Sequence, residues 1–367
     1  MHVVVLNPTR QIRATTEILV RRLPTESNVS ITLLVPERAS SRVRSEWTVT
    51  RVSYADRLVP SVRYPVPTAS GVSQIRRTVS AADVVVGIDY DYLPVALATV
   101  LSRAVGTPVV VTTDALPGVS WSYGNRFVDS VAAVYTHTLG RLVFASADAT
   151  VGLGEYLRDG LERFGPADQV DIIPNGVDTT EFDLPDTASR RDDSDRPRLL
   201  YVGRLDPVKG VDRLLKTLQS LREGGIDATL TVVGEGTRRE SYEALADRLG
   251  VSDETTFVGY QSDVVPFYHN ADVLVLPSRA EGQPTVLMEA QACGIPVVTT
   301  DAGGAAEVVE VGEVVSAGDP AALAEAVESV VATDEAPSRQ ARDHVVETLS
   351  ESITADEYLE LFQSLTE

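Results

Sequence analysis

Cysteine is almost missing from this sequence, and its few histidines lack the spacing of metal ligands. The 367 residues include a single cysteine, Cys293, which excludes an internal disulfide. No histidine lies near Cys293 in sequence, so we expect a small buried side chain rather than a nucleophile. The four histidines lack metal-ligand spacing, so no metal site is expected; they are His2, His137, His269 and His344.

Long apolar runs are absent as well. No stretch approaches the roughly 20 apolar residues of a membrane-spanning helix. The first residues, MHVVVLNPTR, lack the basic region and long apolar run of a signal peptide. These absences predict a cytoplasmic protein. Its length and its hydrophobic fraction of 43% suffice for two domains, each with its own core.

Lysine is scarce, and acidic residues dominate. Lys209 and Lys216 are the only lysines among 32 basic residues, and the net charge is −21 with a pI of about 4.6. Such a composition is similar to that of proteins from salt-accumulating halophiles, because high salt screens charge repulsion. It predicts a halophilic archaeon as the source and says nothing about function.

Basic side chains are concentrated at the start of the chain. Residues 1–80 hold 12 arginines against five acidic residues, a local balance of +7. Such asymmetry suggests an anionic partner for this part of the chain. Nucleic acid is not the expected partner, because the sequence has no recognition motif and no interleaved aromatic pattern.

Apolar strands alternate with helical patterns along most of the chain. This alternation predicts α/β domains with parallel, doubly wound sheets. The polar, proline-bounded residues 185–197 are interpreted as a linker between a first domain, residues 1–184, and a second, residues 198–352. Buried strands are expected at residues 2–6, 31–35, 84–88, 108–113, 198–202, 228–233, 255–258, 271–276 and 296–300.

The stretch at residues 277–309 holds the first candidate site. An apolar strand ends at Ser278, and Glu281 and Glu289 follow with seven residues between them, before a helix and a further strand. The loop of such a unit lies at the carboxyl end of its first strand, where open α/β sheets bind ligands. The two carboxylates can accept hydrogen bonds from hydroxyls at opposite ends of an elongated ligand. The alternative is that Glu281 caps the helix and Glu289 faces water.

The start of this helix suits an anion. Gly282 allows the backbone to approach a ligand closely. Pro284 and Thr285 stand where the helix begins, so free backbone N–H groups and the positive helix end point outward. We therefore expect a pyrophosphate to bind here.

A second loop, VGRLDPVKG at residues 202–210, follows another strand. Gly203 ends that strand, and Arg204 and Lys209 place two positive charges close to a helix start, which suits a diphosphate. Two solvated surface cations are the alternative. The scarcity of lysine favours the functional interpretation, so we expect Lys209→Ala to lower turnover strongly and to leave folding intact.

Three motifs carry a family resemblance. E-G-x-P-x-x-L-x-E-A begins at Glu281 and is followed by A-C-G-I-P-V-V, G-R-x-x-x-x-K-G begins at Gly203, and I-P-N-G-V-D-x-x-x-F ends at Phe182. Together they closely resemble the retaining GT-B glycosyltransferases of family 4. The resemblance implies a GT-B architecture, in which two doubly wound Rossmann-like domains face each other across a cleft. It also implies that residues 353–367 pack back on the first domain.

The resemblance implies residue roles and a reaction. Glu281 would hold the hydroxyls of the donor sugar and Glu289 the nucleotide ribose, while Arg204, Lys209 and the helix start would stabilise the leaving diphosphate. The implied reaction transfers a sugar from a nucleotide-sugar with retention at the anomeric carbon, without a metal or another cofactor. The implied donor site comprises Gly203, Arg204, Lys209, Gly234, Val258, Gly259, Glu281, Gly282, Pro284, Thr285, Val286 and Glu289, with Val258 and Gly259 pairing to the base through backbone groups.

The first half departs from the family pattern. Asp114 stands where many members carry a histidine; as a catalytic residue it would hold a sugar hydroxyl or take the acceptor's proton, and a turn or helix cap is the alternative. The first loop, LNPTRQIRATTE, lacks the usual glycine, which leaves the handling of the acceptor open. Asp89 and Asp91 spell the D-x-D metal motif of a different glycosyltransferase fold, but a strand-end turn is favoured.

The acceptor and the enzyme class leave alternatives. We expect a membrane-embedded lipid or a lipid-linked glycan as acceptor, approached by the arginine-rich residues 1–80 at an anionic membrane surface. Three other classes share the fold: a sugar-nucleotide epimerase, a phosphorylase carrying pyridoxal phosphate on a lysine, and a non-catalytic glycan-binding or scaffold protein.

Overall fold

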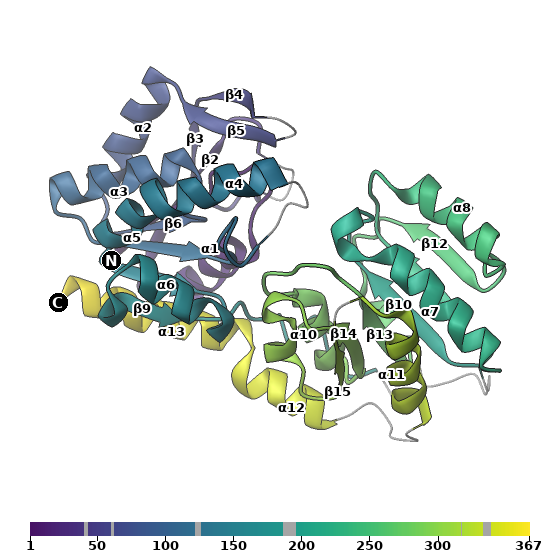
Figure 1. Cartoon of the computed structure of the whole chain (residues 1–367). Helices are drawn as coiled ribbons and strands as arrows, with labels where there is room; N and C mark the ends of the chain where they lie inside the picture. The colour runs from purple at the N-terminus through teal and green to yellow at the C-terminus, as the bar shows by residue number, and fades with distance from the viewer. Residues whose placement is uncertain (40–42, 60–61, 122–125, 186–195, 317, 333–338) are drawn as a thin grey trace. The chain divides into compact units, whose positions relative to one another are not determined.

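Two compact units make up the protein. The computed structural model describes residues 1–39, 43–59, 62–121, 126–185, 196–316, 318–332 and 339–367 (Figure 1). The first unit comprises Met1–Asn175 and Glu351–Glu367, and the second comprises Gly176–Ser350. Most of the expected linker, residues 186–195, lies outside the described residues.

The boundary between the units lies at Asn175 rather than at residue 184. Val177 donates its backbone N–H to the carbonyl oxygen of Leu349, and Val177 and Phe182 are buried in the core of the second unit. The segment after Asn175 therefore packs with the second unit, because its apolar side chains find their partners there.

The first unit is built on a parallel sheet of seven strands in the order β3-β2-β1-β6-β7-β8-β9. Its central strands are buried runs of valine, as expected where helices cover both faces of a sheet. The strands are β1 (His2–Leu6), β2 (Ser30–Pro36), β3 (Val49–Val52), β6 (Val84–Ile88), β7 (Val109–Thr113), β8 (Ala149–Gly152) and β9 (Val170–Ile172), and a separate antiparallel hairpin consists of β4 (Tyr54–Val59) and β5 (Val62–Pro67).

The helices of the first unit come from both ends of the chain. The last helix, α13, packs beside α1, where Arg21 and Arg22 form ion pairs with Glu351, and its side chains Tyr358 and Phe362 are fully buried. The final residues therefore belong to the first unit. Its helices are α1 (Ala14–Glu26), α2 (Ala69–Val79), α3 (Leu93–Val105), α4 (Arg126–Tyr135), α5 (Arg141–Ser146), α6 (Arg158–Phe164) and α13 (Glu351–Thr366).

The second unit has a parallel sheet of six strands in the order β12-β11-β10-β13-β14-β15. The strands are β10 (Arg198–Val202), β11 (Thr229–Val233), β12 (Thr255–Gly259), β13 (Val273–Leu276), β14 (Val297–Thr300) and β15 (Gly312–Val315). The helices are α7 (Val211–Glu223), α8 (Arg239–Leu249), α9 (Val265–His269), α10 (Thr285–Ala292), α11 (Pro320–Ala332) and α12 (Arg339–Thr348). Both sheets confirm the predicted α/β class with doubly wound, Rossmann-like sheets.

Each sheet reverses its strand order once. The reversal falls between β1 and β6 in the first unit and between β10 and β13 in the second. Ligands of open α/β sheets bind beside the carboxyl ends of the strands at such a reversal. The loops that follow β10 and β13 are the two that carry the strongest sequence motifs.

Two expectations from composition can be compared with the structure. Cys293 is fully buried, and burial raises the pKa of its thiol to about 12, so the thiol is inert as expected. Among the described residues, no helix is long and apolar enough to cross a membrane.

Candidate functional site

The loops after β10 and β13 meet at the reversal point of the second sheet. Gly210 ends the first loop in the left-handed conformation, with φ of 72°. A Cβ at Gly210 would overlap the carbonyl oxygen of Pro277, at the start of the second loop, so only glycine allows this approach. The sequence motifs that contain Lys209 and Glu281 are thereby brought together.

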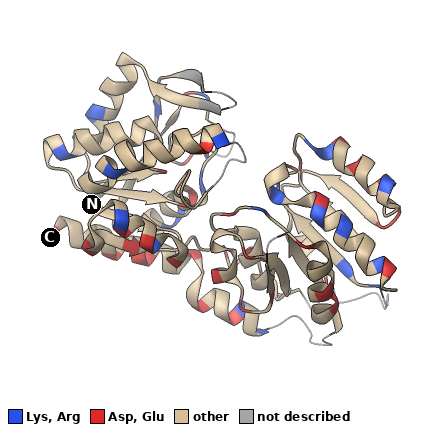
Figure 2. Ribbon diagram, in the orientation of Figure 1, with Lys and Arg blue, Asp and Glu red and all other residues tan. Residues whose placement is uncertain are grey.

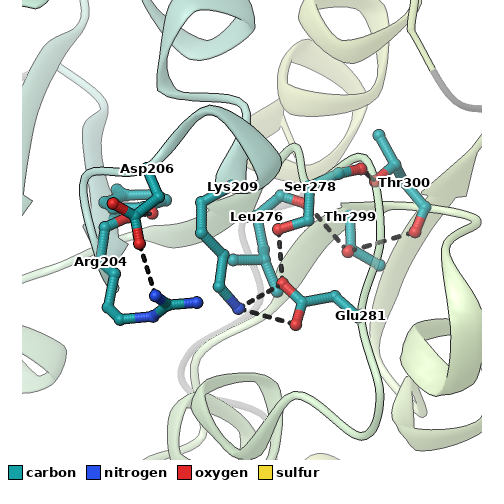
Figure 3. Close-up of polar contacts among 9 residues, drawn as sticks. Arg204, Asp206, Lys209, Leu276, Ser278, Glu281, Thr299 and Thr300 are labelled. Atoms are coloured by element: carbon teal, nitrogen blue, oxygen red, sulfur yellow. Dashed lines mark hydrogen bonds and ion pairs between the residues drawn. The ribbon is translucent and has the colours of Figure 1, made fainter. Parts of the chain in front are cut away.

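Lys209 and Glu281 form the central contact of this site. The Lys209 ammonium donates to both carboxylate oxygens of Glu281, at 2.8 and 2.7 Å, and the two side chains point toward each other (Figure 3). Glu281 is 6% exposed, and the Ser278 hydroxyl donates to the same carboxylate. Glu281 therefore does not cap the helix as a solvated side chain; it is a buried carboxylate neutralised by one of the chain's two lysines.

Arg204 lies on the same loop and pairs with a neighbouring acid. Its side chain is 63% exposed, and its guanidinium forms an ion pair with Asp206 (Figure 3). Its backbone carbonyl accepts a hydrogen bond from the Tyr201 hydroxyl at 2.8 Å, which holds the loop backbone. The predicted pairing of Arg204 with a diphosphate stays a prediction.

The Glu281 loop is held from its other side by residues that the sequence analysis missed. Gly303 has φ of 56°, and a Cβ there would overlap the Glu281 carbonyl oxygen. Gly304 donates its backbone N–H to the carbonyl of Gly282 at 2.9 Å, and the Thr300 hydroxyl donates to the carbonyl of Ser278. The pair of glycines after β14 was the only sequence signal for this contact.

Glu289 is held inside α10 by a residue from α9. Its carboxylate accepts a hydrogen bond from the hydroxyl of Tyr268 at 2.7 Å, and Tyr268 is fully buried. Glu289 therefore has a fixed side chain instead of facing water freely. The helix begins at Thr285 after Pro284, as expected, so its first N–H groups lie beside the Glu281 loop.

The remaining donor-site candidates follow β11 and β12. A Cβ at Gly234 would overlap the Gly203 carbonyl, so the ends of β10 and β11 lie close together. The Gly234 N–H donates to the Gly259 carbonyl at 2.8 Å, and the Val258 carbonyl accepts from the Gln261 side chain at 3.0 Å. A base that pairs with these two carbonyl oxygens would share them with their present donors or replace those donors. Val286 lies in the first turn of α10.

A cluster of charged side chains occupies the reversal point of the first sheet. Arg13 lies 2.8 Å from Asp89, which is 5% exposed and has φ of 61° directly after β6. Burial raises the pKa of Asp89 to about 6. The pKa of Asp91 rises to about 7, through burial and then through repulsion by Asp89 and Asp114. Asp89 thus forms a strand-end turn and an ion pair. Among the described residues, no group of three or more His, Cys, Asp and Glu side chains could hold a metal ion.

Asp114 follows β7 and belongs to this same cluster. Its backbone carbonyl accepts a hydrogen bond from the Tyr156 hydroxyl, while its charge contributes to the raised pKa of Asp91. The Thr113 hydroxyl closes the turn by donating to the carbonyl of Ala115 at 2.6 Å. The turn is therefore made by Thr113, and the catalytic role of Asp114 stays a prediction.

A buried asparagine organises the first loop, which lacks the glycine of the family pattern. The Asn7 amide nitrogen donates to the carbonyls of Thr9 and Gln11 at 2.9 and 3.0 Å. Its oxygen accepts from the Arg13 N–H and the Thr16 hydroxyl, both at 3.1 Å. This loop is therefore shaped by side-chain hydrogen bonds, and it presents Arg13 at the reversal point.

Comparisons with known protein families agree with the motifs. Residues 186–344 match the family described as Glycosyl transferases group 1, and residues 14–181 match Glycosyltransferase Family 4. The two matches together span most of the chain.

Curated relatives point to the same activity. A GDP-mannose-dependent alpha-(1-6)-phosphatidylinositol monomannoside mannosyltransferase of Mycolicibacterium smegmatis is 32% identical over 267 residues, which cover 68% of each chain. The enzyme of that name from Mycobacterium tuberculosis is 36% identical over 186 residues, about half of its length (48%). A D-inositol 3-phosphate glycosyltransferase of Segniliparus rotundus is 35% identical over 177 residues, covering 45% of this chain and 39% of that one.

Solved structures match the whole fold. Sucrose-phosphate synthase from Thermosynechococcus elongatus has a TM-score of 0.77 at 19% identity, covering 99% of this chain and 98% of that one. HepE of Anabaena, solved in complex with UDP and glucose, has a TM-score of 0.77 at 16% identity, covering 99% and 100%. The chain thus has the GT-B fold, and it belongs to the glycosyltransferases of group 1 and family 4, transferases of class EC 2.4.

Proposed function

We propose that this enzyme transfers a sugar from a nucleotide-sugar to a lipid-linked or glycan acceptor, with retention at the anomeric carbon and without a metal or other cofactor. The donor class is supported by the GDP-mannose-dependent relative and by HepE, which was solved with UDP and glucose. The acceptor class is supported by the phosphatidylinositol mannoside named for that same relative.

The Lys209–Glu281 ion pair is the observation that carries the proposal. An ammonium has three N–H donors, and Glu281 accepts two of them, which leaves one for a diphosphate oxygen. Glu281 has further acceptor capacity on its carboxylate for hydroxyls of the sugar. The pair thus stands at the junction of a sugar and a diphosphate, at the sheet edge where such ligands bind.

Three neighbouring groups complete the donor site in this proposal. The first N–H groups of α10 bind the diphosphate, aided by the positive end of the helix. Arg204, whose side chain is largely exposed, adds charge-assisted hydrogen bonds to the same anion. Glu289, fixed by Tyr268, accepts hydrogen bonds from the ribose hydroxyls.

Metal independence follows from this set of charges. As the bond to the sugar breaks, negative charge grows on the diphosphate, and fixed donors that face it lower the barrier. Lys209, Arg204 and the start of α10 would donate hydrogen bonds to the diphosphate oxygens that a divalent ion binds in other transferases. Asp114 in the first unit is proposed to hold a sugar hydroxyl or to take the acceptor's proton.

The membrane is the proposed place of action, and the enzyme would reach its acceptor from the cytoplasmic face. The arginine-rich residues 1–80 were expected to provide the contact. However, Arg13, Arg21 and Arg22 form ion pairs with Asp89 and Glu351 inside the first unit. Part of the basic excess is thereby neutralised, so the first 80 residues do not by themselves define a membrane surface.

The test is a transfer assay with defined stereochemistry. The enzyme is incubated with GDP- and UDP-sugars and lipid acceptors in the presence of EDTA, and the released nucleotide and the anomeric configuration of the product are measured. We expect nucleotide release that depends on the acceptor, with the configuration of the donor preserved. An inverted product would contradict retention, and loss of transfer in EDTA that added magnesium restores would contradict metal independence.

A further inference from the structure

The helical segment at residues 126–146 of the first unit has an unusual outer face. It comprises α4, a π-helical turn at Thr136–Gly140 and α5, in direct succession. Figure 1 shows α4 on the outside of this unit. No residue of α4 is buried, whereas α5 buries Val143 and Phe144 against the core. The segment therefore lies on the surface of the unit and exposes one side along its whole length.

Large apolar side chains stand on that exposed side. Phe127 is 69% exposed, Val131 50%, Val134 64% and Leu142 65%. The first three are spaced at four and three residues, so they share one helix face. Single exposed apolar residues are ordinary, but four on one helical segment form a contiguous apolar patch of the kind found at binding surfaces.

The same face carries no negative charge. Its other exposed residues are Arg126, Ser130, His137, Thr138, Arg141 and Ala145. Asp129, the one acidic residue of the segment, is only partly exposed. A surface segment without an exposed acidic residue is not expected in a chain with a net charge of −21. Figure 2 shows acidic residues along α13, whereas α4 is uncharged except near one end.

We propose that this face, called here the α4 face, docks on an anionic lipid bilayer. Phe127, Val131, Val134 and Leu142 would enter the boundary between headgroups and acyl chains, as the apolar side of an interfacial helix does. Arg126 and Arg141, near the two ends of the segment, would contact anionic headgroups. The absence of exposed acids on this face keeps acidic side chains out of the contact, where an anionic surface would repel them most strongly.

Charge complementarity favours a bilayer over a second copy of the chain. Across this contact a second copy would present the same two arginines, Arg126 and Arg141, and no exposed acid, so it supplies no counter-charge, whereas anionic headgroups do. The α4 face is a different surface from the arginine-rich residues 1–80. It combines exposed apolar side chains with exposed arginines. It does not depend on the donor chemistry, which belongs to the second unit.

Vesicle flotation tests the α4 face. Wild-type protein is mixed at about 0.1 M salt with vesicles of phosphatidylcholine, alone or with phosphatidylglycerol. We expect wild type to float with the mixed vesicles, and Phe127→Ser/Val131→Ser/Leu142→Ser to bind them at least about tenfold more weakly. The matched control, Val314→Thr/Val346→Ser, removes exposed valines of the second unit and should float as wild type does.

A second variant separates charge from apolar contact. Arg126→Gln/Arg141→Gln should lower binding to mixed vesicles and weaken its salt dependence. Equal flotation of the triple variant and wild type, or no flotation of wild type, would overturn the proposal. So would a wild-type dimer that the triple variant converts to monomer, because a second copy would then be the occupant.

The fold and the donor site provide independent readouts. Exposed substitutions should leave the melting temperature almost unchanged, and the triple variant should bind nucleotide-sugars as wild type does. A wild-type protein that floats but binds no nucleotide-sugar would refute the proposed function and leave the α4 face standing. A wild-type protein that binds a nucleotide-sugar but does not float would refute the proposal for the α4 face alone.

Discussion

At the scale of single residues, the Lys209–Glu281 pair is the most informative contact. A buried ion pair adds little net stability, because the desolvation of both charges offsets their attraction. Its position at the reversal point of the sheet, on two loops with ligand-binding motifs, therefore favours a role in binding over a role in folding.

The buried Lys209–Glu281 pair adds a cost in stability to the effect expected of Lys209→Ala. The substitution strands the Glu281 carboxylate, which is 6% exposed, without its ammonium partner. We expect the free energy of unfolding to fall by about 3 kcal/mol, together with loss of donor binding. Urea denaturation measures the first effect. Lys216→Ala, at the other, exposed lysine, should change stability by less than about 0.5 kcal/mol.

A double variant distinguishes stability from function. Lys209→Met/Glu281→Gln removes both charges, so most of the lost stability should return while donor binding stays about 100-fold weaker than in wild type. If Lys209→Ala is as stable as wild type and still binds the donor, the Lys209–Glu281 pair contributes neither to stability nor to donor binding.

Asp91 should make stability depend on pH. Its pKa rises from 3.8 in the unfolded chain to about 7 in the folded protein, so the folded state favours the protonated form. Its contribution to stability is therefore fully present below about pH 4 and is lost as the pH rises through about 7. Asp91→Asn should reduce the loss of unfolding free energy between pH 5 and pH 8, measured in urea. An identical pH dependence in variant and wild type would show that Asp91 ionises normally.

At the scale of elements, the Glu281 loop is clamped between neighbouring segments. Gly303 holds it from the turn after β14, and Gly210 allows the loop after β10 to touch its start. Arg279 reaches from the loop to α7, where its guanidinium forms two hydrogen bonds with Asp212 at 2.9 and 2.7 Å. The site is thus preorganised by backbone packing as well as by side-chain charges.

Gly303→Ala tests this clamp. The added Cβ would overlap the Glu281 carbonyl, in a residue whose left-handed backbone also disfavours alanine. We expect donor binding to weaken at least about tenfold, in addition to a loss of about 1–2 kcal/mol from the backbone conformation. Gly225→Ala is the control, because Gly225 is left-handed too but has open space at its Cβ. Equal donor affinity in the two variants would show that the clamp does not position Glu281.

Local sequence patterns predicted the helices and strands and much of the candidate site in the second unit. The valine runs identified the strands, and Pro284 and Thr285 correctly marked the start of α10. Long-range contacts left no such pattern. The hydrogen bond from Tyr268 to Glu289 spans 21 positions, and Asn7 shapes its loop with ordinary polar side chains. The boundary at Asn175 also escaped prediction, because it depends on where Val177 and Phe182 find apolar partners.

At the scale of the whole molecule, net charge should control stability. Repulsion within a chain of charge −21 opposes the compact state, and salt shortens its range from about 10 Å at 0.1 M to about 3 Å at 1 M. We therefore expect the melting temperature to rise between 0.1 and 1 M KCl. At pH near 5, close to the pI of about 4.6, the rise should be much smaller. A melting temperature that is insensitive to KCl at neutral pH would show that repulsion is unimportant.

The central claim is that the carboxyl ends of β10 and β13 bind a nucleotide-sugar. Isothermal titration of wild type and of Lys209→Met/Glu281→Gln with GDP- and UDP-sugars, in about 1 M KCl, tests it most directly. We predict that one of these donors binds wild type, and that the folded double variant binds it about 100-fold more weakly, since two charge-assisted contacts are lost. No binding to wild type, or equal binding to both proteins, would contradict the account.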